Sequence, residues 1–311
     1  MQGKLKGYYI FFAIGIATLS IRALLDSQFR NSTLLYLLVP FCVSVLIHEL
    51  APVREGEGVG RYMGRHLRDA TIVMLGSSAL LFEGFICVLF FMPIYYVLVL
   101  IGFAFSALAD RGGGDDDDGG PRVGAYAIPL GVLLLSMEGL TEPTTVARYR
   151  EATRVAVVEG SVAELQANMA RPIVFPKERD WYLSIFPLPD RVEAGTLKAG
   201  DIHKMHFTYR RWFFANLHQG EMHLRIAEVS PRRIRTQITR DDSYLSHYMR
   251  VEGTEVNFTD LGGGRTRVAL TVKYRRLLDP YWYFGPLQQA AAERSAGYLI
   301  QSIIARKAQV S

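Results

Sequence analysis

Cysteine is scarce in this sequence. The 311 residues include two, Cys42 and Cys87, and both lie in apolar runs. Two such residues form no disulfide framework, and they do not report the redox compartment. The chain after Arg148 has no cysteine, no HExxH spacing and no GxSxG motif. These absences exclude a cysteine nucleophile, a zinc-protease helix and a nucleophile elbow from that half.

Charged residues are rare before Arg148 and common after it. A bilayer crossing needs about 20 mostly apolar residues, so residues 1–141 are predicted to form a transmembrane region. The basic start, MQGKLKG, has no cleavage site after its apolar run and indicates an uncleaved anchor. The uncharged run after Asp69 is long enough for two helices, which are predicted to turn near Met92 and Pro93. The predicted spans are residues 8–25, 33–47, 70–92, 93–109 and 123–137.

Basic residues near the span ends predict the orientation, because cytoplasmic loops carry an excess of Lys and Arg. They place the N-terminus in the cytoplasm. Five spans then put the C-terminal half outside the cytoplasm, whereas four spans put it inside, and we expect five. Residues 110–122, DRGGGDDDDGGPR, are predicted to be a solvated linker rather than a cation site, because consecutive Asp residues between glycines repel one another. The basic residues counted are Lys4, Lys6, Arg22, Arg30, Arg54, Arg61, Arg65 and Arg68.

Glu83 lies inside the apolar run LLFEGFICVLFFMP. An ionisable group within a membrane is costly and is usually paired, protonated or functional. Two interpretations remain open: a structural hydrogen bond across the bundle, or a role in a proton or ligand path.

The period of the hydrophobic pattern changes to two after residue 150, which indicates strands. Ser161 and Glu164 form a capping box that opens a short helix over 161–169. In the last strand Val268, Leu270 and Val272 share one face, and a long amphipathic helix over 287–307 closes the chain. This order predicts an α+β domain in which a curved antiparallel sheet surrounds the final helix. The predicted strands are residues 154–158, 201–209, 221–229, 233–239, 251–259 and 267–276.

The segments VAVVEGSVAELQANM and GGGRTRVALTVKYRR, the latter followed by a long helix, resemble the START-like superfamily (SRPBCC, polyketide cyclase-like) over about residues 150–311. The apolar half, with LFEGFICVLFFMP, resembles membrane-anchored bacterial members, which implies the cytoplasmic (inner) membrane. The resemblance implies a helix-grip fold with an elongated apolar cavity that binds a lipid, quinone or similar molecule. It supplies no universal catalytic residue and no cofactor. A long insert, residues 171–189, would alter the cavity mouth.

Four histidines, His203, His206, His218 and His223, lie on or beside neighbouring strands. Residues three apart on a strand point to opposite faces, so His203 and His206 cannot both hold one ion. We therefore predict no metal site and no catalytic residue. His203 would share a face with Met205, Phe207 and Tyr209. The candidates for lining a ligand cavity are His203, Met205, Phe207, Tyr209, Tyr274, Trp282, Phe284 and Tyr298.

Three functions remain open on this sequence. The first is binding or transfer of a hydrophobic small molecule at the lipid bilayer, and the second is a cyclase or dehydratase acting on such a molecule. The third is an assembly subunit with a membrane-protein partner. Nucleic acid is not expected as a partner: the net charge is +5, but no segment concentrates Lys and Arg between aromatics.

The stretch DPYWYFGP, residues 279–286, carries four aromatics between two prolines. We predict that it connects the last strand to the final helix, with Pro286 in the first helical turn. Its aromatics could then plug the core, gate the cavity, or anchor the domain at lipid headgroups.

Overall fold

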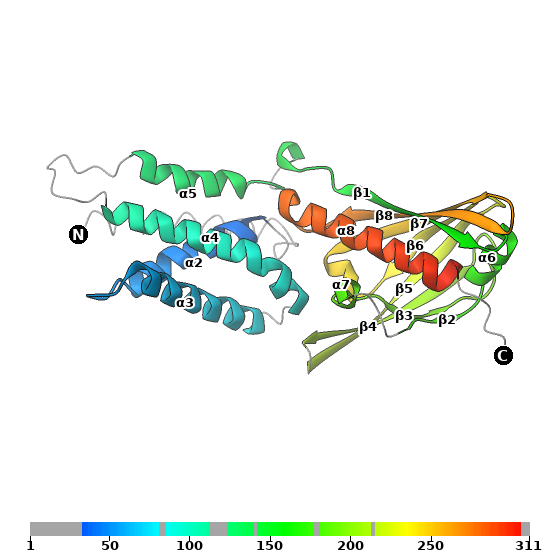
Figure 1. The fold of residues 1–311 in the computed structure, drawn as a ribbon, viewed down its shortest axis with the longest axis horizontal. Coiled ribbons are helices and arrows are strands. Elements are labelled where there is room, and N and C mark those ends of the chain that lie inside the picture. Colours follow the sequence, from blue (N-terminus) through cyan, green and yellow to red (C-terminus); the bar gives the residue numbers. More distant parts are fainter. Residues whose placement is uncertain are drawn as a thin grey trace. The chain divides into compact units, whose positions relative to one another are not determined.

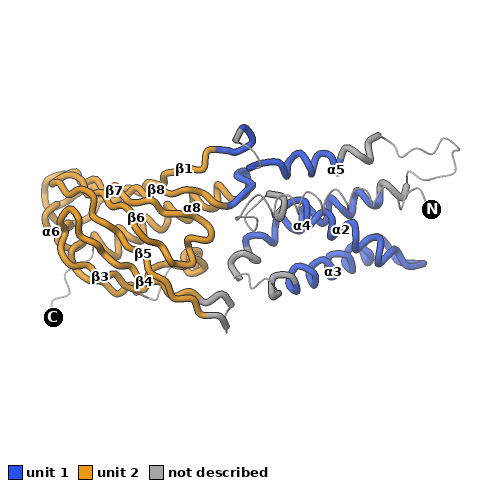
Figure 2. Tube along the Cα trace, turned by 180° about the vertical axis from the view of Figure 1, so that it is seen from behind, with its two compact units in different colours: residues 1–146, 278–283 blue, residues 147–277, 284–311 orange. Residues whose placement is uncertain are grey.

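The computed structural model describes residues 33–80, 85–111, 123–139, 142–176, 181–212 and 215–305. The chain divides into two compact units, which Figure 2 colours separately. Unit 1 comprises residues 1–146 together with 278–283, and unit 2 comprises residues 147–277 and 284–311. The division falls between the apolar and the charged parts of the sequence, and a short later segment returns to unit 1.

Unit 1 is helical. Its elements are α2 (Thr33–Leu50), α3 (Val59–Leu80), α4 (Phe85–Arg111), α5 (Val123–Leu135) and a short turn, η2 (Glu142–Thr144). Among the described helices one, α4 over Phe90–Ala107, is long and apolar enough to cross a bilayer, and α2 has a shorter apolar stretch, Leu37–Leu50. Leucine, phenylalanine and valine side chains of α2 pack against Ile94 and Leu98 of α4 and Val132 of α5.

Buried hydrogen bonds connect the helices of unit 1. The Ser44 hydroxyl donates to the Val99 carbonyl at 2.6 Å and lies 2.8 Å from His66 Nε2, so it links α2, α4 and α3. The Tyr62 hydroxyl lies 2.6 Å from His48 Nδ1. Gly102 faces Ser44 so closely that an added Cβ would lie 2.7 Å from the serine Cβ. Small residues at this crossing therefore let the two helix backbones approach, which brings the buried polar groups within reach of one another.

The predicted turn near Met92 and Pro93 is wrong, because α4 continues through Pro93. A proline inside a helix removes one hydrogen bond, and the rest of this 27-residue helix keeps its own. The described part of α3 ends at Leu80, and that of α4 begins at Phe85. Residues 81–84 lie between them. These residues, Glu83 among them, lie outside the described part, as do the predicted first span at 8–25 and linker residues 112–122.

Unit 2 is built on one antiparallel sheet of eight strands in the order β1-β8-β7-β6-β5-β4-β3-β2. The chain's first strand in this unit thus pairs with its last. The sheet curves, and α8 lies across its concave side (Figure 1). The strands are β1 (Tyr149–Glu159), β2 (Ile173–Val174), β3 (Pro189–Glu193), β4 (Ile202–Trp212), β5 (Ala215–Val229), β6 (Arg233–Asp241), β7 (Met249–Asp260) and β8 (Arg265–Arg276). The helical elements are α6 (Val162–Met169), α7 (Trp181–Ser184), η3 (Tyr244–His247), α8 (Tyr281–Leu299) and a π-helical turn, η4 (Ile300–Ile304).

Local sequence signals explain most of these elements. The Ser161–Glu164 capping box is confirmed: the Ser161 backbone N–H donates to Glu164 Oε2 at 2.8 Å, and the Glu164 N–H donates to Ser161 Oγ at 3.4 Å. The β7–β8 hairpin turns at three consecutive glycines whose φ angles are +75°, +60° and +69°. Side chains rarely adopt this left-handed conformation, so glycine suits the turn. The curved antiparallel sheet and the long C-terminal helix of the sequence prediction are both present.

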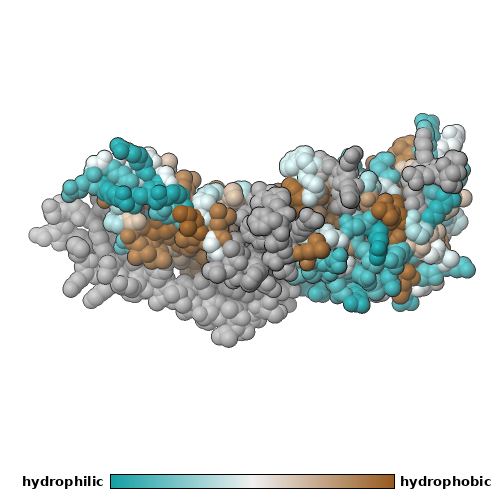
Figure 3. Space-filling model, turned by 90° about the horizontal axis from the view of Figure 1, so that it is seen from below, coloured by the Kyte–Doolittle hydropathy of each residue, from teal (hydrophilic) through white to brown (hydrophobic). Residues whose placement is uncertain are grey.

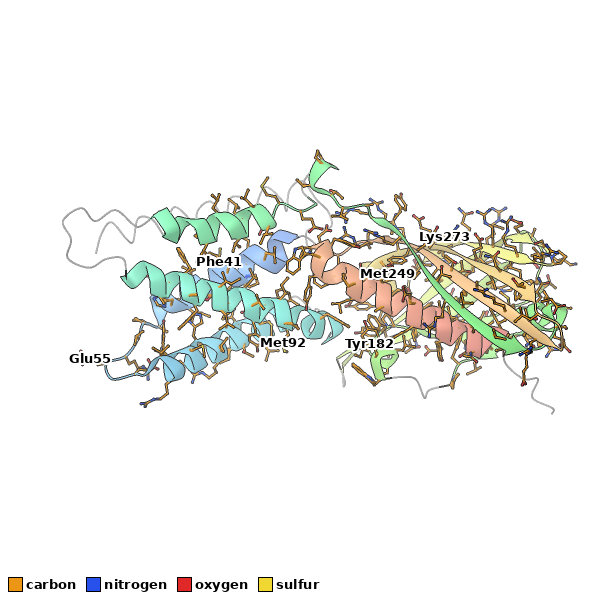
Figure 4. All side chains as sticks on the ribbon, turned by 45° about the horizontal axis from the view of Figure 1, so that its top comes forward. Phe41, Glu55, Met92, Tyr182, Met249 and Lys273 are labelled. Atoms are coloured by element: carbon orange, nitrogen blue, oxygen red, sulfur yellow. The ribbon has the colours of Figure 1, made fainter. Side chains whose placement is uncertain are left out.

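The two faces of the sheet differ in chemistry. Val268, Leu270, Val272 and Tyr274 are buried on the concave face, as the alternation in β8 predicts. On the convex face Lys273 lies 3.6 Å from Glu151 of β1 and 3.3 Å from Glu255 of β7. Met249 lies on the concave face and Lys273 on the convex face, and both are labelled in Figure 4. The buried concave face is therefore the one that can form a site for an apolar molecule.

The start of α8 differs from the prediction. The helix begins at Tyr281 rather than at residue 287, and Pro286 lies inside it. The residue that explains this earlier start is distant in the sequence. The Tyr281 backbone N–H, which has no partner within its own helix, donates to Glu138 Oε1 at 2.6 Å. A carboxylate at a helix N-terminus is stabilising, so Glu138 lets the helix begin earlier than local residues suggest.

Candidate functional site

A cavity of about 170 Å³ lies between the concave face of the sheet and α8. The strands β3 to β8 supply most of its wall, α8 and η4 close one side, and the segment before β3 supplies three residues. The lining residues are Met169, Phe186, Pro187, Leu188, Pro189, Val192, Leu197, His203, Met205, Phe207, Met222, Leu224, Ile226, Thr236, Ile238, Leu245, Met249, Val251, Thr254, Val256, Leu270, Val272, Ala291, Ala292, Ser295, Leu299, Ile303 and Ile304.

Two properties of this lining are chemically informative. Methionine occurs four times, at positions 169, 205, 222 and 249, and this flexible side chain lets a wall change shape. Polar side chains are few, namely His203, Thr236, Thr254 and Ser295. The two threonine hydroxyls lie 2.8 Å apart and partner each other across β6 and β7. The cavity therefore suits an apolar molecule with very few polar atoms.

His203 is the titratable residue among the described lining residues, and it is 7% exposed. Its Nε2 lies 2.8 Å from the Thr196 carbonyl oxygen. The Thr196 hydroxyl donates to the Asp201 carboxylate, which also accepts the Lys198 backbone N–H at 3.0 Å. These hydrogen bonds, that from the Thr196 hydroxyl first, lower the pKa of Asp201. The loop between β3 and β4 is thus held by Asp201, and the loop in turn fixes the imidazole ring.

The structure places three of the eight predicted candidates on the cavity wall: His203, Met205 and Phe207. The other five are not among the lining residues of this cavity. Tyr209 stacks on Tyr244 with ring centroids 4.7 Å apart, Tyr274 donates to Gln289 Oε1 at 2.9 Å, and Tyr298 stacks on Phe175. Phe284 is buried away from the cavity, and Trp282 is 52% exposed in unit 1. The three tyrosines thus have partners that are not lining residues, whereas most of the cavity wall is aliphatic.

Sequence reasoning missed much of the wall. Phe186, Pro187, Leu188 and Pro189 line the cavity and belong to the insert that was expected to alter its mouth. The sequence feature that could have identified them is an apolar, proline-containing run in a segment that connects two strands, where polar residues are usual. On α8, the small residues Ala291, Ala292 and Ser295 line the cavity because they leave space that larger side chains would fill.

The remaining histidines lie away from the cavity. His206 lies on the opposite face of β4 from His203, as predicted, with Nε2 2.9 Å from Glu193 and Nδ1 3.3 Å from Glu221. His223 Nε2 is 3.2 Å from the same Glu221, and His218 Nε2 is 3.1 Å from the Asp242 carbonyl. Within the described residues, no group of three or more His, Cys, Asp or Glu side chains is arranged to hold a metal ion.

Asp241 is a partly buried residue at the end of β6, outside the cavity lining, and its Oδ2 atom is buried. It accepts the Ser243 backbone N–H at 3.0 Å and the Ser243 hydroxyl at 2.6 Å. Ser243 precedes η3, but its hydroxyl is used by Asp241 and makes no capping bond. Burial raises the pKa of Asp241 above its ordinary value, and the two hydrogen bonds only partly oppose this effect.

Replacing Asp241 by asparagine should stabilise the protein more at pH 7 than at pH 4. A raised folded-state pKa contributes stability below the unfolded value of 3.8, and that contribution is lost as the pH rises through the folded value. Asparagine can accept the same two hydrogen bonds and carries no charge at either pH. Thermal unfolding of the wild type and of Asp241→Asn at both pH values tests this. An equal gain at the two pH values would contradict the assigned burial effect.

No protein-family model matches the chain, and a comparison with curated proteins also gives no match. Solved structures of START-type and cyclase domains resemble its C-terminal half. The Zhui aromatase/cyclase from Streptomyces sp. R1128 is 15% identical, with 50% of this chain and 92% of that chain covered and a TM-score of 0.32. A START superfamily protein from Mycobacterium smegmatis is 10% identical, with coverages of 52% and 99% and a TM-score of 0.33. A norcoclaurine synthase point mutant from Thalictrum flavum is 10% identical, with coverages of 51% and 94% and a TM-score of 0.33.

Proposed function

We propose that this chain is a bacterial inner-membrane protein whose C-terminal helix-grip domain binds or transfers a hydrophobic small molecule. The observation that carries the proposal is the cavity between the sheet and α8, which has an almost wholly apolar wall. Ligand sites are concave and mostly apolar, with a few placed polar groups. His203 and Ser295 are such groups in this cavity.

The size of the cavity defines what it holds without rearrangement. An apolar cavity of about 150 Å³ is enough for a benzene-sized molecule, and drug-sized ligands occupy about 300 to 1,000 Å³. The cavity of about 170 Å³ therefore suits one ring or a short part of an acyl chain. The four methionines on its wall allow it to widen around a larger lipid or quinone.

Membrane attachment is the second part of the proposal. Besides the apolar stretch of α4, helices α2, α3 and α5 expose large apolar side chains, for example Ile72 at 62% and Leu134 at 58%. Figure 3 shows a hydrophobic area on the visible face of unit 1, and the same view of unit 2 has both hydrophilic and hydrophobic areas. Exposed apolar area of this kind is unusual unless a membrane or a partner covers it. We propose a cytoplasmic N-terminus and, with five spans, an extracytoplasmic C-terminal domain.

The composition of the cavity wall fits a carrier better than it fits a cyclase or dehydratase. Acid–base catalysis needs a proton acceptor and donor within reach of the substrate. Among the described lining residues no carboxylate, lysine or tyrosine is present, and His203 alone could exchange a proton. A carrier needs no such pair, and a tether at the bilayer raises the concentration of membrane-dissolved ligand around it.

Native mass spectrometry of the full chain, purified in mild detergent, tests the proposed binding. We expect an apolar small molecule to remain bound after the detergent is removed in the gas phase, and to be identified after organic extraction. A chain that carries no molecule and takes up neither lipid nor quinone when these are added would overturn the proposal.

A further inference from the structure

We infer that the cavity selects ligands that carry a hydrogen-bond donor, such as a phenol, a quinol or another hydroxyl-bearing ring, over their carbonyl or hydrocarbon counterparts. This inference rests on the proposed binding function and adds the chemical class of the ligand. It is based on the hydrogen bond of His203 Nε2, because this bond determines whether the other ring nitrogen, Nδ1, donates or accepts.

A backbone carbonyl oxygen can accept a hydrogen bond but cannot donate one. The 2.8 Å contact between His203 Nε2 and the Thr196 carbonyl therefore requires the proton on Nε2. In a neutral imidazole the other nitrogen then carries a lone pair and acts as an acceptor. Nδ1 of His203 is thus an acceptor on a residue that lines the cavity.

Three features keep this tautomer in place. Thr196 is fixed through its hydroxyl by Asp201, so the carbonyl partner of His203 cannot readily turn away. His203 is 7% exposed, so bulk water has little access to the ring. Within the described residues, Nδ1 has no protein partner that would compete with a ligand. An acceptor without a protein partner, on a residue of a mostly apolar wall, favours a ligand that brings a donor. A ligand that displaces water from this nitrogen without offering a donor would leave it unpaired, which costs free energy.

The other polar groups on the wall do not favour either kind of ligand. Thr236 and Thr254 use their hydroxyls on each other. The Ser295 hydroxyl can rotate, and it can donate to a ligand or accept from one. The preference for a donor therefore resides in His203, and Ser295→Ala provides the matched control.

The test compares p-cresol with p-xylene, which differ by a hydroxyl in place of a methyl group and fit a cavity that holds one ring. Isothermal titration of the full chain in detergent at pH 8 gives the ratio of the two affinities. The two probes differ in solubility, but this difference is the same for every variant. It therefore cancels when the affinity ratio of one variant is compared with that of another. We expect His203→Leu to shift this ratio about tenfold toward p-xylene, the size of one well-formed hydrogen bond. Ser295→Ala should leave the ratio within about twofold.

A second measurement needs no substitution, in case His203→Leu disturbs the loop. With histidine labelled by nitrogen-15, the Nδ1 resonance of His203 in the wild type should move upfield when p-cresol is added and stay unchanged with p-xylene. If both probes bind but the resonance is unmoved and the ratio is unchanged in His203→Leu, the inference is overturned and the binding function stands. If neither probe binds to the wild type, the proposed function fails as well.

Discussion

Gly253→Ala should lower the stability of unit 2 by about 3 kcal/mol, the upper end of the usual cost of overpacking a core. A Cβ at position 253 would lie 2.2 Å from the Thr236 carbonyl oxygen, a backbone atom that cannot move without separating β6 from β7. Gly253 also lies where the β7–β8 register shifts, so the sheet has already accommodated one irregularity there. Thermal unfolding of the full chain in detergent should show a melting temperature lower by roughly 6–12 °C.

The matched control is the same substitution at Gly195, in the loop before β4. No atom lies within 4 Å of a Cβ at that position, and the residue is exposed. Its effect should stay within about 0.5 kcal/mol. Similar losses of stability at the two positions would contradict the close approach of β6 to β7 at Gly253.

Ala292→Leu should weaken binding of p-xylene at least tenfold. Ala292 is 5% exposed and lines the cavity from α8, so three added carbon atoms occupy space that a ligand ring would need. Forcing such a volume clash costs roughly 1–3 kcal/mol, and 1.4 kcal/mol corresponds to a factor of ten. In the absence of ligand the leucine partly fills an empty space, so the melting temperature should change little. Isothermal titration together with thermal unfolding measures both effects.

Ala290→Leu makes the same substitution two residues earlier on α8. Ala290 is partly exposed and is not part of the cavity wall, so probe affinity should stay within about twofold of the wild type. Equal affinities of the wild type and Ala292→Leu would show that p-xylene binds elsewhere, and the cavity between the sheet and α8 would lose its assigned role.

The sheet was predictable because its signals are local. Alternation in β8, the glycine turn before it and the capping box of α6 each lie within about a dozen residues and agree with the observed elements. The start of α8 was not predictable in this way, since the carboxylate that receives its first N–H belongs to Glu138. The turn placed at Pro93 failed for a related reason: an apolar run carries no charge pattern that would mark where one helix ends.

The sequence predicted an apolar cavity between the sheet and the final helix, but it identified few of the residues that line this cavity. Residues on β4 were found because alternation assigns His203, Met205 and Phe207 to one face. Tyr274 lies on the same concave face, but it donates a hydrogen bond to Gln289 of α8 and is not among the lining residues. Periodicity gives the face of a strand and not the position along it at which packing leaves a gap. That position depends on small residues of α8, which only the assembled sheet and helix bring opposite the strands.

The pairing of β1 with β8 has a consequence for the order in which unit 2 folds. Tyr149 lies opposite Arg275, so the two strands are separated by most of the unit's sequence. During synthesis β1 emerges first, and its partner strand is complete only when Arg276 has left the ribosome. Until then β1 has no partner strand on that side, and pairings of this sequence separation form slowly. Ribosome-bound chains that end before β8 should therefore lack a protected β1, and the cavity should form only after α8 is made.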